Sequence, residues 1–394
     1  MRDHIKFSLF LWSLIVLFTM SCSKEVEKSE TDHAHIETNR SLIFPVPHDA
    51  ENRTVSSWTQ EYDGKLYYFH MGPKNSIFIY DVDNEQFLDK LTFDQVGPKG
   101  IGTMTSFFPG EDSLLYIFSR DFTLTAFSFE GEIISKFPYL KSTDGDIAGP
   151  SGSFNVVNGR LIVERPWLYF TVLPEGNWNL LNQEFVGSFK TEVRIDMESG
   201  LVEKMPWTYP DGYYSATSFD PYFSRTYANG RFVYSYSTSA YVYAFTLQGA
   251  VMKFEGTSQF ARELKNYKTS DFQTYATSVL SFGRYRHIIW DKYRQLFYRF
   301  VYLGEEITGV LPDGKLLEDK IRFPSNYSIQ VFDRDLNLLG EEMLSPNTYV
   351  IDNYIIHPDG LYLSTCNPAN DSIEEDKMEF RLINLSNYSS VNRF

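Results

Sequence analysis

The sequence predicts an all-β protein, a six-bladed β-propeller with four antiparallel strands in each blade. Its composition favours strands, because it holds 33 Phe and 27 Tyr residues and aromatic side chains pack well on a half-buried pleated surface. From residue 41 onward, turn residues separate strand-like runs in units that recur about every 45 to 70 residues. Repeats of this length are typical of propeller blades, and strands at this density leave little room for helices.

Each repeating unit begins with a strand, a tight turn and a second strand. The turns contain Gly or Asx residues, which supply the positive φ that a hairpin turn commonly needs. A third strand follows in every unit, and a second turn leads to a fourth strand in the first five units. The six hairpins are EYDGKLYYF at Glu61, FFPGEDSLLYIF at Phe107, NVVNGRLIVE at Asn155, TYANGRFVYSY at Thr226, IIWDKYRQLFYRF at Ile288 and IIHPDGLYLS at Ile355.

The sixth unit lacks a clear fourth strand, because the chain ends in SNYSSVNRF. The run SLIFPV at 41–46 has strand character but no partner nearby. We therefore expect this N-terminal strand to complete the last blade, which closes the ring and removes an exposed sheet edge. The alternative is that VNRF at the C-terminus fills that place.

One segment has helical character, residues 258–280, between the fourth and fifth units. The spacing of Phe260, Leu264 and Tyr267 matches one face of a short surface helix. The sequence predicts a helix here and no other.

The N-terminus has the pattern of an export signal, which we assign to residues 1–21. Arg2 and Lys6 precede an apolar run, 7–20, that is shorter than the roughly 20 residues needed to span a bilayer. The signal ends in FTMSC and places Cys22 where the bacterial lipobox has its acylated cysteine. We predict that Cys22 carries the lipid that anchors the protein to a membrane; the alternative is a plain secretory signal.

Residues 22–40 are highly charged and contain no aromatic residue, so they cannot bury apolar surface and are expected to form a disordered tether. The propeller domain is then expected over residues 41–394. Cys366 is the only cysteine besides Cys22, so no disulfide is expected if Cys22 carries lipid.

The net charge argues against nucleic acid as a partner. Lys and Arg total 36 against 51 Asp and Glu, which gives a formal net charge of -15. Basic residues that neutralise phosphates supply most non-specific nucleic-acid affinity, and this chain repels phosphate on balance. The Arg-rich stretch RYRHIIWDKYRQLFYRF, at 284–300, is therefore the first hairpin of the fifth blade rather than a nucleic-acid surface.

That hairpin still contains more arginines than a plain turn requires. On alternating strand positions, some of Arg284, Arg286, Arg294 and Arg299 must point along one face, toward the channel or a neighbouring blade. We expect them to pair with carboxylates of adjacent blades, with an anionic ligand as the alternative. Arg286, His287 and Arg299 are accordingly candidate ligand-binding residues.

No motif predicts a cofactor or a metal. VGPKGIGT at 96–103 lacks the order Gly-Lys-Ser/Thr that opens a phosphate-binding helix. DVDNEQ and DRDLN, at Asp81 and Asp333, lack the glycine and glutamate of a calcium-binding EF-hand loop and are predicted to be hairpin turns. No known catalytic signature is present.

An aromatic connection of unusual length, 205–227, separates the third and fourth units. Long loops on a rigid scaffold often carry function, and aromatic rings bind sugars or peptide side chains. The alternative is a loop packed down by its own rings. The candidate ligand-binding residues here are Trp207, Tyr209, Tyr213 and Tyr214.

The lipobox-like start, DQVGPKGIG at 94–102 and IIWDKYRQLFYRF in the fifth unit together carry a resemblance. The chain resembles the six-bladed propeller lipoproteins of the Bacteroidetes, of the domain-of-unknown-function 4221 type. This resemblance implies the architecture and an outer-membrane, periplasmic or surface-facing location in the cell envelope. It brings no catalytic residues with it.

The function predicted from these features is a lipid-anchored extracytoplasmic binding or scaffold module, with a glycan, a peptide or an envelope protein as candidate partner. One alternative is a propeller enzyme of the polysaccharide lyase or hydrolase type, with ionisable residues such as His287 or His357 at the central channel. Another is a platform subunit of an envelope complex, which predicts a large exposed apolar patch.

Overall fold

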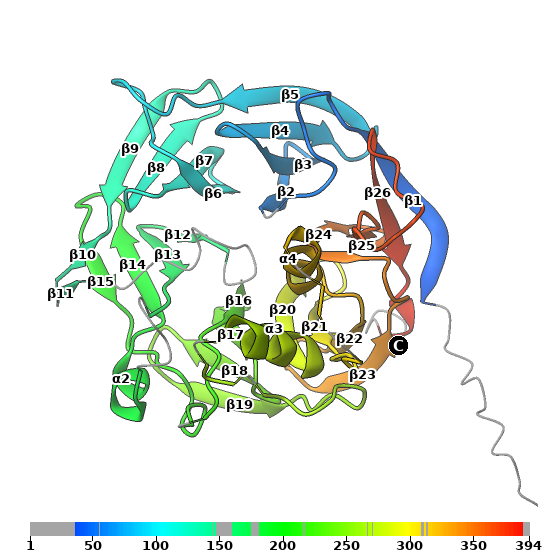
Figure 1. Cartoon of the computed structure of the whole chain (residues 1–394). Coiled ribbons are helices and arrows are strands. Elements are labelled where there is room, and N and C mark those ends of the chain that lie inside the picture. Colours follow the sequence, from blue (N-terminus) through cyan, green and yellow to red (C-terminus); the bar gives the residue numbers. More distant parts are fainter. Residues whose placement is uncertain are drawn as a thin grey trace, which may run out of the picture. The chain divides into compact units, whose positions relative to one another are not determined.

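Six antiparallel sheets of four strands follow one another around a central axis (Figure 1). This confirms the predicted all-β class and the six-bladed propeller. The computed structural model describes residues 36–54, 56–143, 145–146, 160–174, 181–215, 217–265, 267–269, 271–308, 311–312 and 314–388.

The first strand of each unit lies beside the axis, and the following strands step outward in chain order, as in β2-β3-β4-β5. All six inner strands therefore run in the same direction along the channel. The inner strands are β2 (Ser57–Tyr62), β6 (Met104–Pro109), β12 (Ile162–Glu164), β16 (Phe223–Ala228), β20 (Arg284–Asp291) and β24 (Val350–His357).

The middle strands form the core, because neighbouring blades cover both of their faces. Every residue of β21 and of β22 is buried, for example. The second strands are β3 (Lys65–Gly72), β7 (Leu114–Ser119), β13 (Trp167–Thr171), β17 (Arg231–Tyr236), β21 (Leu296–Tyr302) and β25 (Gly360–Ser364). The third strands are β4 (Ser76–Asp81), β8 (Thr123–Ser128), β14 (Glu192–Asp196), β18 (Tyr241–Thr246), β22 (Tyr327–Phe332) and β26 (Lys377–Ile383).

The outer strands have one face toward solvent, so apolar and polar residues are mixed along them. They are β5 (Gln86–Thr92), β9 (Ile133–Pro138), β15 (Val202–Lys204), β19 (Val251–Glu255), β23 (Leu338–Met343) and β1 (Glu37–Pro45). Two minor elements follow: the hairpin of β10 (Lys141–Ser142) with β11 (Gly145–Asp146), and the 3-10 turn Ser386–Tyr388.

The N-terminal strand closes the ring, as the sequence predicts. β1 pairs antiparallel with β26, with Leu42 opposite Phe380 and Phe44 opposite Met378. The Phe44 ring is fully buried and lies 5.5 Å from the ring of Tyr80 in the first blade. The closing strand therefore joins the last blade to the first, and β1 begins at Glu37, before the expected start of the domain.

The first two strands of the third blade are not the segments that the sequence predicted. The hairpin expected at Asn155, with its turn at Asn-Gly, lies largely outside the described residues. β12 instead pairs with β13 through a turn at Arg165 and Pro166, so LIVE is the inner strand and WLYFT the second strand. The prediction was wrong because the Asn-Gly pair has the chemistry of a hairpin turn, whereas the turn that is used lacks Gly and Asx.

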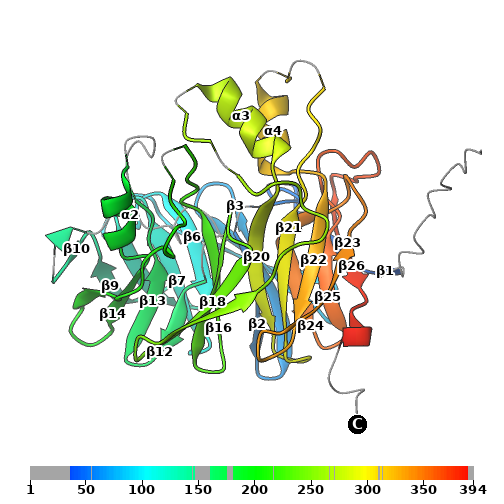
Figure 2. The ribbon, with the colours of Figure 1, turned by 90° about the horizontal axis from the view of Figure 1, so that it is seen from below.

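Within the ranges that the structure describes, three helices lie on the face where the inner strands begin (Figure 2). They are α2 (Gln183–Ser188), α3 (Phe272–Ser281) and α4 (Lys315–Arg322). The sequence analysis missed α2 and α4. Ala276 and Leu280 of α3 pack against Leu317 of α4, and this apolar contact is what makes so short a helix as α4 stable.

The helix expected over 258–280 begins only at Phe272, where Asp271 accepts the backbone N–H of Thr274 as its N-cap. Phe260 and Leu264 pack instead against Tyr285 and the strand that follows it. Their spacing therefore reflects contacts of an irregular segment. None of the helices in the described ranges has the length and apolar composition of a membrane span.

Candidate functional site

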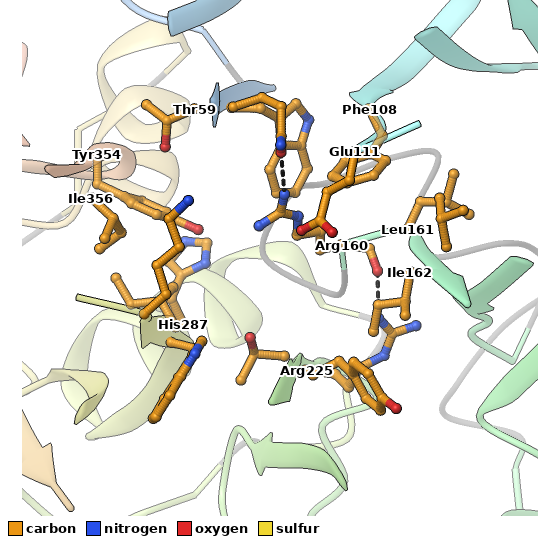
Figure 3. A pocket seen from close by; sticks show the side chains of 18 of the residues that line it. Thr59, Phe108, Glu111, Arg160, Leu161, Ile162, Arg225, His287, Tyr354 and Ile356 are labelled. Atoms are coloured by element: carbon orange, nitrogen blue, oxygen red, sulfur yellow. Dashed lines mark hydrogen bonds between the residues drawn. The ribbon is translucent and has the colours of Figure 1, made fainter. Parts of the chain in front are cut away.

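The six inner strands enclose a cavity of about 310 Å³, lined by residues of every blade (Figure 3). The lining follows the inner strands toward the hairpin turn at their far end, as with 57–61 on β2 and 287–292 at β20. Aromatic and aliphatic side chains alternate there with polar ones. The polar lining includes Gln60, Glu61, Glu111, Arg160, Arg225 and His287.

The two ends of the cavity differ in exposure. Ser57 and Ser224, near the start of their strands, and His287, in the middle of β20, are buried. Glu61 and Lys292, at the hairpin-turn end, are exposed to solvent. The cavity therefore opens among the hairpin turns, on the face opposite the three helices.

Arg160 reaches into the middle of this cavity (Figure 3). Its Nη2 donates to Oε1 of Gln60 at 3.0 Å, which connects the third blade to the first past the inner strand of the second. The guanidinium carbon lies 4.7 Å from the ring centroid of Phe108 and 5.8 Å from that of Trp58. These two rings support the cation, as aromatic faces commonly do.

Arg160 is half-buried and has few protein partners for its guanidinium. Within the described residues it donates one side-chain hydrogen bond and forms no ion pair. Burial lowers the pKa of Arg160, while the nearby Tyr354 and Glu111 act in the opposite direction. Since a guanidinium has five N–H donors, Arg160 can offer several to a molecule in the cavity.

A buried ion pair holds the backbone of Arg160 in place. Arg225 on β16 donates from Nε to Oε2 of Glu192 at 3.1 Å and from Nη1 to the carbonyl oxygen of Arg160. Tyr234 also donates its hydroxyl to Glu192. Complete burial raises the pKa of Glu192, and the charge of Arg225 opposes that rise.

His287 lies at the buried end of the cavity beside a carboxylate. Its Nε2 is 2.5 Å from Oδ1 of Asp352 on β24. The pairing register of β20 shifts between Tyr285 and Ile288, and that of β24 shifts between Val350 and Tyr354. Irregularities of this kind turn side chains toward sites that a regular strand cannot reach.

The pKa of Asp352 lies below its ordinary value. Burial alone would raise it, because a buried carboxylate loses its hydration. The hydrogen bond and charge of His287, followed by the charges of Arg286 and Arg322, outweigh burial. Asp352 is therefore an anion in the folded protein at neutral pH.

At the open end, Glu61 is neutralised by a residue from another blade. Its Oε2 lies 3.0 Å from Nζ of Lys292 and 3.1 Å from the hydroxyl of Tyr293. The hydrogen bond from Lys292, its charge and the Tyr293 hydroxyl lower the pKa of Glu61. Glu111 and Glu164, also exposed at this end, form no ion pair with any described residue.

The aromatic residues predicted in the 205–227 connection do not line the cavity. Trp207 and Tyr209 are each 2% exposed; the Trp207 ring centroid lies 4.7 Å from that of Phe232. The Tyr209 ring stacks on that of Tyr213 at 5.6 Å. The Tyr209, Tyr213 and Tyr214 hydroxyls donate to the backbone oxygens of Pro221, Asp220 and Leu181 respectively.

This packing favours the alternative of a loop held down by its own rings. A binding role for these four residues stays a prediction. Cys22, the predicted lipid site, lies outside the described residues.

Arg299 does not line the cavity, and its side chain packs inside the protein instead. It is fully buried, stacks on the ring of Tyr285 at 3.3 Å and donates to Oγ of Ser235 at 2.8 Å. Its other donors reach backbone carbonyls, including that of Ser239 at 2.6 Å. Burial lowers the pKa of Arg299 to about 9, against the opposing effect of Tyr285. The expected carboxylate partner was therefore wrong for Arg299.

The other arginines of this hairpin find varied partners. Arg284 lies 3.4 Å from the carboxylate of Asp220, in the connection before the fourth blade, as expected. Arg294 pairs at 2.8 Å with Asp291 of its own hairpin and donates to the His357 carbonyl of the sixth blade. Arg286 is half-buried near Asp352 and does not line the cavity.

Of the candidate ligand-binding residues, only His287 lines the cavity. His357 lies near the sheet edge, 3.5 Å from both Asp83 and Asp359. No group of three His, Cys, Asp or Glu side chains in the described ranges is arranged to hold a metal ion.

The sequence analysis missed Arg160 as a cavity residue. Residues 160–164 were expected to form a second strand, one step away from the channel. The available signal was the pair of alternating runs in LIVERPWLYF, whose second run has the aromatic content of the second strands in other blades.

The fold and the cavity together define a six-bladed β-propeller with a polar site on its axis. A family model described as "Domain of unknown function (DUF4221)" matches residues 30–343, and the chain belongs to this family. A search of curated proteins found no match.

A solved structure of a family member repeats the fold. A DUF4221 family member from Bacteroides vulgatus superimposes with a TM-score of 0.76 at 19% identity, covering 87% of this chain and 96% of that chain. A chain of U3-55K gives a TM-score of 0.43 at 9% identity, covering 88% and 99% respectively. A chain of a mitotic checkpoint complex gives a TM-score of 0.40 at 11% identity, covering 88% of this chain and 92% of that chain.

Proposed function

We propose that this protein is a lipid-anchored binding protein of the cell envelope, and that its ligand occupies the central cavity. The observation that carries the proposal is the Arg160 guanidinium, which reaches into the cavity with one hydrogen bond and no ion pair to the described residues. Buried polar groups in proteins are normally hydrogen-bonded, and a cluster of free donors in a cavity is typical of a ligand site.

Two fully buried arginines, Arg225 and Arg299, support this interpretation by contrast. Arg225 uses its donors on Glu192 and on a backbone carbonyl, and Arg299 donates five hydrogen bonds to protein oxygens. These arginines hold blades together: within the described residues Arg299 donates five hydrogen bonds and Arg225 donates three, against one for Arg160. Arg160 differs from both, because most of its donors face the cavity rather than protein acceptors.

The size of the cavity limits the ligand. Ligand pockets commonly measure roughly 300–1,000 Å³, and about 310 Å³ lies at the lower end of that range. A single sugar or one to two amino-acid residues fits this volume. A polysaccharide chain or a folded partner does not, so the glycan or peptide of the original expectation becomes a monomer or a very short peptide.

The proposed location rests on the N-terminal sequence. Cys22 follows an export-type apolar run, and the family relative of known structure comes from a Bacteroides species. Multiple acylation of Cys22 would attach the protein stably to a membrane, whereas one acyl chain would hold it only marginally. The open end of the cavity would then be available to small molecules of the envelope.

A second candidate function is catalysis in the same cavity. The observation that favours it is the hydrogen bond between His287 and Asp352, because a carboxylate that orients an imidazole is a recurrent arrangement in enzymes that use a general base. Nδ1 of His287 has no hydrogen-bond partner among the described residues. A catalytic role therefore requires the ligand itself to supply the group on which His287 acts.

A thermal-shift screen of the full chain against monosaccharides, amino acids and dipeptides tests the binding proposal. We expect at least one compound to raise the melting temperature of the wild-type protein and of Arg165→Gln, an exposed arginine outside the cavity lining. The same compound should leave the melting temperature of Arg160→Gln unchanged. If no compound stabilises the protein, or if Arg160→Gln responds as the wild type does, the proposed function is wrong.

A further inference from the structure

Charges of opposite sign face the cavity and form no ion pair with the described residues. Arg160 lies inside it, and Glu111 follows the inner strand of the second blade at the open end. Figure 3 shows the Glu111 side chain reaching toward that of Arg160. The two nevertheless form no ion pair.

The remaining charges around the cavity are mostly compensated. Lys292 neutralises Glu61 at 3.0 Å, and Arg225 is paired with the fully buried Glu192. Among the described lining residues, what is left over is one cation in the interior and, at the open end, the carboxylates of Glu111 and Glu164. A ligand meets a positive site deep in the cavity and a negative site nearer its mouth.

This order of charges selects among the ligands that Arg160 could bind. A guanidinium binds a carboxylate with two parallel N–H donors, which is a strong and geometrically specific contact. A simple carboxylate in that place would also lie close to Glu111 and would be repelled by it. An ammonium group beside the ligand carboxylate turns the same neighbour into an attractive partner.

We infer that the cavity binds a small zwitterion, a free amino acid or a dipeptide, with its carboxylate on Arg160 and its ammonium toward Glu111. This inference rests on the proposed function and narrows it to one ligand class. A neutral sugar uses neither of the two free charges, and a plain acid or a plain amine uses only one.

The apolar lining provides room for a hydrophobic side chain on that ligand. Tyr354 and Ile356 line one side of the cavity, and Leu161 and Ile162 line the other (Figure 3). Burying an aliphatic side chain there removes apolar surface from contact with water, which favours binding. L-Leucine and glycyl-L-leucine are therefore suitable probes.

Isothermal titration calorimetry on the full chain separates the two ligand charges. The matched compounds are L-leucine, 4-methylpentanoate, which lacks the amine, and 3-methylbutylamine, which lacks the carboxylate. We expect L-leucine or glycyl-L-leucine to bind, and both isosteres to bind at least tenfold more weakly, since each loses one charged contact.

Three variants assign the contacts. Arg160→Gln should remove binding of L-leucine, and Arg160→Lys should weaken it, because lysine keeps the charge but loses the paired donors. Glu111→Gln should weaken the binding of L-leucine about tenfold and strengthen the binding of 4-methylpentanoate. The protein should then no longer prefer L-leucine over 4-methylpentanoate. Glu130→Gln, an exposed carboxylate outside the cavity lining, is the control and should change neither affinity.

The outcomes distinguish this inference from the proposed function. 4-Methylpentanoate or a monosaccharide could bind the wild type as tightly as L-leucine, with an affinity that is lost in Arg160→Gln. In that case the inferred zwitterionic ligand is wrong, and the proposed binding site at Arg160 is still correct. If none of these compounds binds, both the zwitterion inference and the proposed binding function are wrong. Equal melting temperatures of the variants and the wild type exclude misfolding as the cause of a lost signal.

Discussion

Nη2 of Arg160 lies 3.0 Å from Oε1 of Gln60, so a side chain that precedes the inner strand of the third blade reaches the inner strand of the first. The backbone of Arg160 is fixed as well, because Arg225 of the fourth blade donates to its carbonyl oxygen. Arg160 is thus held from two directions while most of its guanidinium faces the cavity. A preorganised cation of this kind binds a ligand without first having to be ordered.

The ion pair of Glu192 and Arg225 should stabilise the propeller only while both partners are present. We expect Glu192→Gln and Arg225→Met each to lower the free energy of unfolding by about 3–5 kcal/mol, since each leaves the other charge buried and uncompensated. The double variant should be more stable than at least one single variant. Urea unfolding measures all four proteins, and strictly additive losses would contradict this account.

His70 should make the fold sensitive to mild acid. It is fully buried, and burial lowers its pKa from 6.5 to about 4. Between these values the unfolded chain binds a proton that the folded chain does not, so stability falls as pH decreases from 6.5 toward 4, by roughly 3 kcal/mol in total. The melting temperature of His70→Gln should fall less over this range than that of the wild type.

His48 provides the matched control for that measurement, because its side chain is 96% exposed. His48→Gln should follow the wild-type dependence on pH. Parallel curves for the wild type and His70→Gln would show that His70 titrates alike in the folded and unfolded chains.

Trp207 should contribute to stability rather than to an exposed surface. Its ring is 2% exposed among Phe232, Tyr234 and Phe245, so Trp207→Ala leaves a cavity that costs about 3–5 kcal/mol. Phe185→Ala, at a ring that is 40% exposed, should cost much less. Differential scanning calorimetry compares the two. A melting temperature of Trp207→Ala close to that of the wild type would restore the binding-loop hypothesis for residues 205–227.

Cys22→Ala should release the protein from the membrane fraction of the cells that make it. The residue stands at the end of the export-type signal, where acylation of a cysteine creates the anchor. Fractionation followed by immunoblotting measures the distribution. Cys366→Ala is the control, since Cys366 is buried in the fold and should leave the distribution unchanged. Membrane retention of Cys22→Ala would rule out the lipid anchor.

The architecture could be predicted from the sequence because the blades other than the third have Gly or Asx residues at the turn between their first two strands. Asn-Gly at Asn229 and Asp-Gly at Asp63 both lie at turns between first and second strands, with positive φ at all four turn residues. The closing strand could be predicted because the sixth unit lacked a fourth strand and SLIFPV at 41–46 had no other partner. These are local signals, and they survive in a single sequence.

The site could be predicted only in part. His287 was identified because it stands in an unusual hairpin, and it does line the cavity. Arg160 was missed because an Asn-Gly pair just before it suggested the wrong turn and moved it away from the channel. Aromatic content at Trp207 and Tyr209 could not distinguish a buried loop from an exposed one, because the partners that bury these rings come from the fourth blade.

The central claim is that Arg160 binds a ligand inside the propeller, and a crystal structure of the full chain grown with L-leucine tests it most directly. We predict electron density for the amino acid in the cavity, with its carboxylate within hydrogen-bonding distance of Arg160 and its ammonium toward Glu111. A cavity that holds only water at saturating L-leucine, or L-leucine bound elsewhere on the protein, would contradict the account.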